Sequence, residues 1–188
     1  MHLDALAPAT KAVFGKIARL PTIGNFYLAG GSAVALFRAH RFSYDLDFFS
    51  DRSFDVTALS KDLSRLGKLK AETLEEDTLL GTLDGVKISF FRYSYPVIYP
   101  PKVLQTIKVA DERDLVAMKL QAISSRGTKR DFIDLYWILT KNNWTVSQAI
   151  PWFDKRYQGM NLNRIHLLKS LVYFADAEGE ELEMIKLI

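Results

Sequence analysis

Two glycines separate a strand-like segment from a helix-like segment, and this order restricts the folds open to the chain. Residues 25–29 (Asn-Phe-Tyr-Leu-Ala) are mostly apolar, as in a short strand, and residues 33–39 favour a helix. Gly30-Gly31 therefore lies at a strand-to-helix turn. Such a turn directs free backbone N–H groups and the positive end of a helix dipole at one point, which favours an anion. Ser32 adds a hydroxyl donor.

Two carboxylates follow this turn after twelve further residues. Tyr44-Asp45-Leu46-Asp47-Phe48-Phe49 alternates polar and apolar residues and then becomes aromatic, which is typical of a strand with one face in the core. Side chains alternate along a strand, so Asp45 and Asp47 are expected on one face. Two carboxylates at this spacing suit Mg²⁺, which prefers oxygen ligands and shares its coordination with waters and phosphates.

Neither motif is specific alone, because Gly-Gly is common in turns and Asp-x-Asp is common at solvated strand edges. Together, in the order strand, glycines, helix, strand with carboxylates, they predict a site where metal ions assist in-line attack on the α-phosphate of a triphosphate. Placing Asp45 and Asp47 beside Phe48 and Phe49 would be costly without a compensating cation.

At these residues the chain resembles the DNA polymerase beta-like nucleotidyltransferase superfamily. Arg41-Phe42-Ser43-Tyr44-Asp45-Leu46-Asp47 is similar to the corresponding segment of AbiEii/AbiGii-type nucleotidyltransferases, many of which are toxins of bacterial toxin-antitoxin or phage-defence pairs. A second block with the family's pattern follows over residues 114–123 and 126–136. The likeness extends from about Leu28 to Leu139.

The resemblance implies an NTP-dependent enzyme that uses Mg²⁺, or Mn²⁺, to transfer a nucleoside monophosphate to an acceptor. The implied acceptor is an RNA 3′ end such as that of tRNA, and the implied protein partner is a cognate antitoxin. Two alternatives remain: a protein-nucleotidylating enzyme, and a catalytically inactive module that binds nucleotide or RNA.

The resemblance also assigns site residues. Asp45 and Asp47 hold the metal, and Gly30, Gly31 and Ser32 hold the β- and γ-phosphates. Lys119 reaches the triphosphate as a point charge, against the alternative of a solvated helix lysine. Asp131 or Asp134 orients Lys119 or the nucleotide. The alternatives are that Asp131 is a helix-capping partner and that Asp134 is a surface acid. Arg41 binds phosphate as a fork and Ser43 orders the loop, although such an arginine is often only a salt-bridge partner.

One position departs from the superfamily. Many polymerase beta-like enzymes carry a third carboxylate on a later strand, where it helps to activate the attacking hydroxyl. The corresponding stretch, residues 86–91, holds Ser89 and no acid. Asp84 is a candidate substitute, although Asp84-Gly85 is explained better as a hairpin turn.

Composition excludes some classes of site and of protein. The 188 residues carry a net charge of +3, no cysteine and three histidines without ligand spacing, which argues against disulfides and catalytic zinc. The pI near 9.0 permits a nucleic-acid partner without identifying one. No apolar run approaches about 18 residues and the start lacks a basic signal region, so we expect a cytoplasmic protein with no membrane partner.

We predict an α+β fold: a polymerase beta-like core with a mixed or antiparallel sheet and flanking helices over residues 1–110, and a C-terminal helical bundle over residues 111–188. The expected core elements are helices 8–20 and 56–66 and strands 70–74, 78–83, 86–93 and 103–109. The expected C-terminal helices are 111–125, 128–139, 145–156 and 162–174. We expect residues 176–183 to be an acidic solvated tail. We expect Arg126, Lys129 and Arg130 to form a basic surface loop, with contact to an RNA backbone as the alternative.

Overall fold

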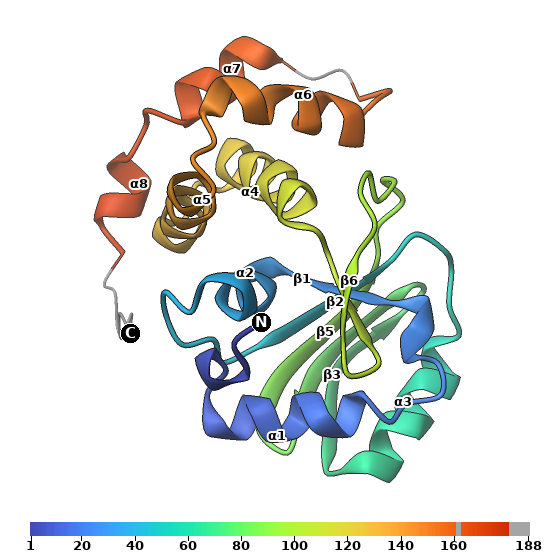
Figure 1. The fold of residues 1–188 in the computed structure, drawn as a ribbon. Coiled ribbons are helices and arrows are strands. Elements are labelled where there is room, and N and C mark those ends of the chain that lie inside the picture. The colour runs from blue at the N-terminus through green and yellow to red at the C-terminus, as the bar shows by residue number, and fades with distance from the viewer. Residues whose placement is uncertain (161–162, 181–188) are drawn as a thin grey trace.

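A mixed sheet of seven strands organises the N-terminal part of the chain in the computed structural model, which describes residues 1–160 and 163–180 (Figure 1). The strand order is β3-β4-β5-β2-β1-β7-β6. The pairs β1–β7 and β2–β5 are parallel and the other pairs are antiparallel. The strands are β1 (Tyr27–Ala29), β2 (Leu46–Ser50), β3 (Leu69–Glu75), β4 (Thr78–Leu83), β5 (Val86–Arg92), β6 (Lys102–Leu104) and β7 (Ile107–Val109).

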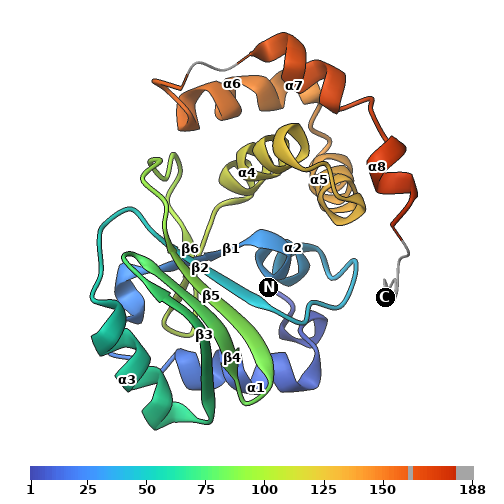
Figure 2. The same cartoon turned by 180° about the vertical axis from the view of Figure 1, so that it is seen from behind.

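Helices form two layers around this sheet. Figures 1 and 2 show α1 and α3 on one face, and α2 between the sheet and the pair α4–α5, with α6 to α8 further out. This arrangement confirms the predicted α+β class. The helices are α1 (Pro8–Ile17), α2 (Gly30–Arg38), α3 (Val56–Leu66), α4 (Glu112–Ser125), α5 (Lys129–Lys141), α6 (Val146–Arg156), α7 (Arg164–Ser170) and α8 (Ala175–Glu178), with short 3₁₀ turns at Leu3–Ala5 and Ile23–Asn25.

Strand β2 shows how the sequence alternation positions the site. Leu46 and Phe48 are fully buried, and the Phe48 ring stacks on Phe90 of β5 with centroids 4.8 Å apart. Asp47 and Phe49 are only half-buried, because a period of two turns them to the opposite face. One face of β2 therefore belongs to the core, and the other faces a cleft beneath α4.

Several predicted local structures are confirmed. Helix α3 and strand β4 have the expected bounds. Asp84 and Gly85 both have positive φ angles, 51° and 83°, as the tight hairpin between β4 and β5 requires. The helix expected over 145–156 is α6, and a reciprocal capping box of Thr145 and Gln148 fixes its start.

Other predicted bounds were wrong. Helix α1 ends at Ile17 rather than Leu20, and α2 begins at Gly30, so the glycines form its first turn. Residues 103–109 are not one strand, because Gln105 adopts a φ of 57° and turns the chain between β6 and β7. The helix expected over 162–174 is limited to α7, with α8 beginning at Ala175; residues 162 and 181–183 lie outside the described part of the chain.

A buried ion pair connects the C-terminal helices with the sheet. The guanidinium of Arg156 on α6 contacts the carboxylate of Asp114 on α4, and both side chains are fully buried. Arg156 also donates to the hydroxyl of Tyr27 on β1 at 2.9 Å, while Asp114 accepts from the backbone N–H groups of Ile98 and Tyr99. This pair therefore joins α4, α6, β1 and the segment before β6. No helix in the described residues is both long and apolar enough to cross a bilayer.

Replacing Asp114 should strongly destabilise the fold. Asp114→Ala leaves the buried Arg156 guanidinium without its counter-ion, so we expect the free energy of unfolding to fall by about 3–5 kcal/mol. Urea unfolding monitored by circular dichroism measures this. The matched control is Asp62→Ala, which removes the partner of the exposed Arg65 and should cost less than about 1 kcal/mol. Equal losses in the two variants would contradict the prediction.

Candidate active site

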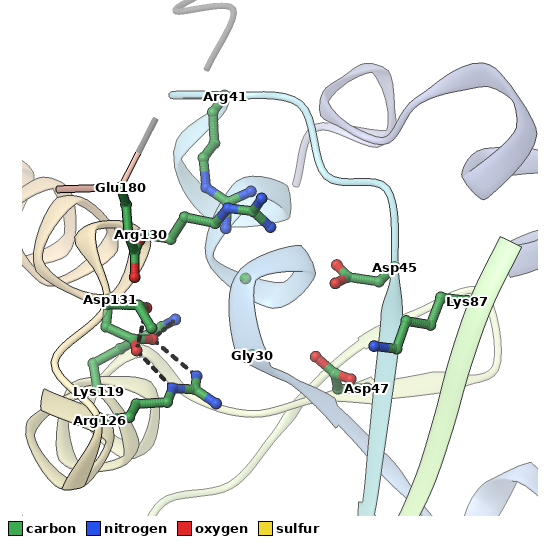
Figure 3. A pocket seen from close by; sticks show the side chains of 12 residues that line it. Gly30, Arg41, Asp45, Asp47, Lys87, Lys119, Arg126, Arg130, Asp131 and Glu180 are labelled. Carbon is green, nitrogen blue, oxygen red and sulfur yellow. Dashed lines mark hydrogen bonds and ion pairs between the residues drawn. The ribbon is translucent and has the colours of Figure 1, made fainter. Parts of the chain in front are cut away.

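A cavity of about 590 Å³ opens where the start of α2 faces the β2 carboxylates on one side and the α4–α5 turn on the other (Figure 3). Its walls carry both signs of charge, with cations more numerous. The lining residues are Gly30, Gly31, Arg41, Asp45, Asp47, Lys87, Lys119, Arg126, Thr128, Arg130, Asp131 and Glu180.

Neighbouring side chains occupy the space that a Cβ would need at either glycine at the start of α2. Gly30 has a φ of 66°, and a Cβ built there would lie 2.7 Å from Oδ2 of Asp47. A Cβ on Gly31 would collide with the guanidinium of Arg41. The absence of side chains therefore lets a carboxylate and a guanidinium approach the first turn of the helix, where free N–H groups favour an anion.

Asp45 and Asp47 line the same cavity, although Asp45 precedes β2 rather than lying within it. Ser89 of β5 is the register partner of Asp47 and donates a hydrogen bond to its carboxylate. The pKa of Asp47 is raised above its usual range by burial and by the charge of Asp45, although Ser89, Lys119 and Lys87 oppose the shift. This electrostatic strain would be relieved by a cation between the two carboxylates.

The two predicted serines hold the loop that carries Asp45. Ser32 and Ser43 are buried, with their hydroxyl oxygens 2.7 Å apart, and Ser32 also donates to the Asp45 carbonyl. The backbone of Ser43 pairs with Ala5 and Ala7 near the N-terminus. Ser43 is thus placed to order the loop. The Ser32 hydroxyl is engaged inside the protein, and its phosphate contact stays a prediction.

Lys119 lies at the centre of a buried ion network. Its ammonium is 2.9 Å from Oδ1 of Asp131 and 2.8 Å from Oδ2 of Asp134. Arg41 donates to both oxygens of Asp134, at 2.9 and 3.1 Å. Arg126 donates to Asp131 at 2.9 Å. The five residues come from the α2–β2 loop, α4, the α4–α5 turn and α5, so the network joins the two halves of the chain.

The charges of this network fix each other's protonation. Burial alone would lower the pKa of Lys119, but Asp134 and Asp131 raise it above its ordinary value. Burial opposes ionisation of Asp131, yet Arg126 and Lys119 lower its pKa to about 2. Lys119, His40 and Arg41 hold the pKa of Asp134 well below the usual range. The two carboxylates therefore favour the charged ammonium form of Lys119 at the cavity wall.

The structure gathers most of the residues singled out from the sequence. Gly30, Gly31, Asp45 and Asp47 meet Arg41, Lys119 and Asp131 at one cavity, and Asp134 stands behind it. Thr128 occupies the N-cap position of α5, but its hydroxyl donates to the carboxylate of Asp131 instead of accepting from a backbone N–H group. Asp84 is also excluded as a third carboxylate here, since it pairs with Lys16 at the hairpin, outside the cavity lining.

Sequence reasoning missed five cavity residues, of which Thr128 was expected only as the first residue of a helix. Arg126 and Arg130, expected on a surface loop, line the cavity, and so does Lys87 of β5. The face of β5 shared by Lys87 and Ser89 was the available signal for Lys87. Glu180, expected in a solvated tail, also lines the cavity and accepts a hydrogen bond from the backbone N–H of Lys129 at 3.0 Å.

Among the described residues, the cavity carboxylates Asp45 and Asp47 are the candidates for binding a metal ion. Residues 1–160 and 163–180 contain no group of three His, Cys, Asp or Glu side chains arranged as a metal site. Asp45 and Asp47 fit Mg²⁺ or Mn²⁺, because such an ion takes its remaining ligands from waters and substrate phosphates. The raised pKa of Asp47 agrees with a site whose charge is incomplete without a cation.

Comparisons with known proteins also indicate a nucleotidyl transferase. The family model described as nucleotidyl transferase AbiEii toxin, type IV TA system, matches residues 12–109 and 92–180. An uncharacterised protein of Aquifex aeolicus (strain VF5), aq_aa25, is 37% identical over 175 residues, which cover 91% of this chain and 84% of that protein.

Solved structures share the fold at low sequence identity. MenT4, a nucleotidyltransferase toxin of Mycobacterium tuberculosis H37Rv, is 16% identical with a TM-score of 0.51 over 76% of this chain and 61% of its own. JHP933 of Helicobacter pylori is 16% identical with a TM-score of 0.52 over 86% of this chain and 85% of its own. The chain thus spans less than two thirds of MenT4. It spans 30% of the Megavirus polyadenylate synthase, which is 14% identical over 70% of this chain with a TM-score of 0.48.

Replacing Asp134 should destabilise the protein in a pH-dependent way. Asp134→Asn leaves Lys119 and Arg41 short of a buried negative charge, so we expect a loss of about 3–5 kcal/mol near neutral pH. A carboxyl whose folded pKa is depressed contributes fully above its unfolded pKa of about 3.9 and progressively less below it. The difference between wild type and variant should therefore shrink as the pH falls below about 4.

Urea unfolding of both proteins between neutral and acidic pH tests this. The control is Asp154→Asn, which removes the charged partner of the exposed Arg164 and should change stability by less than about 1 kcal/mol. A constant difference between wild type and Asp134→Asn over the whole pH range would refute the assigned role of the ionised carboxylate.

Proposed function

The chain belongs to the AbiEii nucleotidyl transferase toxin family and is an NTP-dependent nucleotidyltransferase, and from this premise we propose that it transfers a nucleoside monophosphate to the 3′ end of an RNA such as tRNA. The observation that supports this most is the cavity in which Asp45 and Asp47 face the glycine-led start of α2. Carboxylates for a cation thus stand opposite a site for phosphates.

Different residues contact different parts of the triphosphate. The backbone of Gly30 and Gly31 holds the β- and γ-phosphates, and Arg130 and Lys119 balance their charge. Asp45 and Asp47 would hold Mg²⁺, and the bound ion would supply positive charge to neutralise the charge that develops on the phosphates during transfer.

In the reaction, the oxygen of the acceptor hydroxyl forms a bond to the α-phosphorus, the bond from that phosphorus to the bridging oxygen breaks, and pyrophosphate leaves. The hydroxyl proton is released. Because Ser89 stands beside Asp47 where a third carboxylate would lie, positioning and charge stabilisation carry more of the catalysis than a dedicated general base.

We place this activity in the cytoplasm, where the chain acts as the toxin of a bacterial toxin-antitoxin or phage-defence pair. The family to which it belongs is described as a type IV TA system. The expected partners are therefore an NTP, an RNA acceptor and a cognate antitoxin protein.

The activity should depend on the β2 carboxylates. We expect the full chain, incubated with each α-labelled NTP, Mg²⁺ and total RNA, to label RNA, and Asp45→Ala and Asp47→Ala to reduce labelling by more than about a hundredfold, because the metal-assisted charge stabilisation is lost. Gel autoradiography after nuclease or protease digestion measures the product. Asp84→Ala, which removes a carboxylate outside the cavity, is the matched control and should retain activity.

The same experiment separates the alternatives. Label that resists nuclease and yields to protease would replace the RNA acceptor with a protein. Binding of NTP without labelling of either RNA or protein above the level of Asp45→Ala would contradict transfer to RNA or protein and favour an inactive nucleotide-binding module. Growth arrest on expression of wild type, absent with Asp47→Ala, would support the toxin role.

A further inference from the structure

A second cavity, of about 600 Å³, begins at Asp47 and extends along the cleft-facing side of the sheet. It contains neither Asp45 nor Arg41, and it shares six lining residues with the first cavity: Gly30, Asp47, Lys87, Lys119, Arg126 and Asp131. It includes Phe49 instead, which follows Asp47 on the same face of β2. The two cavities therefore overlap around Asp47, and the second extends past it along β2 toward Phe49, away from Asp45.

The floor of the second cavity is apolar and largely aromatic. Phe49 of β2 and Phe91 of β5 are cross-strand partners with ring centroids 5.8 Å apart, and both are only half-buried. Leu80 of β4 and Met118 of α4 complete this floor and wall, and they are half-buried as well. A platform of this kind suits a flat ring, because every nucleobase has a face that stacks on aromatic side chains.

Cations stand around this platform. Lys87 and Arg126 lie at the junction with the first cavity, and Arg92 lines the second. The side chains of Arg126 and Arg92 are 64% and 46% exposed, although each also pairs with a carboxylate, Asp131 and Asp77 respectively. Exposed cations beside aromatic side chains are the usual combination for binding a single-stranded nucleic acid, whose backbone is anionic.

In-line geometry decides which part of the reaction uses the second cavity. The attacking and leaving oxygens lie on opposite sides of the transferred phosphorus. If the leaving pyrophosphate occupies the first cavity, at Gly30 and Gly31, and the α-phosphate lies at Asp47, the attacking hydroxyl must arrive from beyond Asp47. The second cavity extends that way, because Phe49 and Phe91 follow Asp47 and Ser89 along the parallel strands β2 and β5.

We propose that the second cavity is the acceptor site, in which the 3′-terminal base of a single-stranded RNA stacks on Phe91 and Phe49 while Lys87, Arg92 and Arg126 contact its backbone. This inference rests on the proposed function for the direction of transfer. Binding of a base to Phe91 and Phe49 does not require transfer, so it is measured without catalysis.

The experiment measures binding of a fluorescein-labelled, single-stranded oligoribonucleotide with a free 3′ end to the full chain by anisotropy. Phe91→Leu keeps an apolar side chain in the sheet but removes the aromatic face, and should weaken binding about tenfold. Phe91→Tyr keeps the ring and should bind within about twofold of wild type. The matched control is Phe37→Ala, a half-buried phenylalanine on α2 that lines neither cavity and should not change binding.

Two further measurements locate the base. An oligoribonucleotide carrying 4-thiouridine at its 3′ end should crosslink to the peptide containing Phe91, and one carrying it at the 5′ end should not. Affinity for a non-hydrolysable NTP, measured by calorimetry, should be the same in wild type and Phe91→Leu.

The outcomes are distinct. Oligonucleotide binding that is absent, or unchanged in a folded Phe91→Leu, overturns the proposal, and so does a 3′ crosslink elsewhere. A loss of NTP affinity without a loss of oligonucleotide affinity assigns the platform to the base of the NTP and also overturns it. Phe91-dependent binding and crosslinking without any transfer would support the platform and refute the proposed function instead.

Discussion

The buried ion network around Lys119 is the interaction on which the site depends. Charged groups removed from water are stable only when they are paired, so breaking one contact leaves an uncompensated charge in the interior. Here the partners come from both halves of the chain: Arg41 from the loop before β2, and Lys119, Asp131 and Asp134 from α4 and α5. The helical half must therefore dock in one register for the network to close. The cavity between the halves is a consequence of that register.

The same network sets the charge of the cavity wall. Three cations, Arg41, Lys119 and Arg126, are paired with two carboxylates, Asp131 and Asp134, so the network retains one positive charge. This charge lies next to the first turn of α2, whose free N–H groups carry a partial positive charge. The two effects act in the same direction. They make one side of the cavity favourable to an anion, while Asp45 and Asp47 make the facing side favourable to a cation.

The sequence carries local structure and the central motif more clearly than it carries long-range pairing. Helix α3, strand β4 and the Asp84–Gly85 hairpin follow from apolar spacing and turn residues, and they were predicted with near-exact bounds. The separation of β6 and β7 was missed, because nothing in the residue type of Gln105 marks its positive φ. The parallel pairing of β7 with β1 joins residues some 80 positions apart, and no local pattern encodes it.

The site shows the same division. Gly30, Asp45 and Asp47 were predicted from their order along the chain, and Lys119 from a resemblance that covers its block; the structure places all four at one cavity. Lys87, Arg130 and Glu180 reach the cavity only through the pairing of β5 with β2 and the docking of α5 and α8, so spacing alone does not reveal them. Ser89 was predicted in part: its strand follows from the local sequence, but its neighbour does not. Its place in the strand was predicted, but only the parallel register shows that its hydroxyl faces Asp47, where it stabilises the ionised carboxylate without adding a further negative charge.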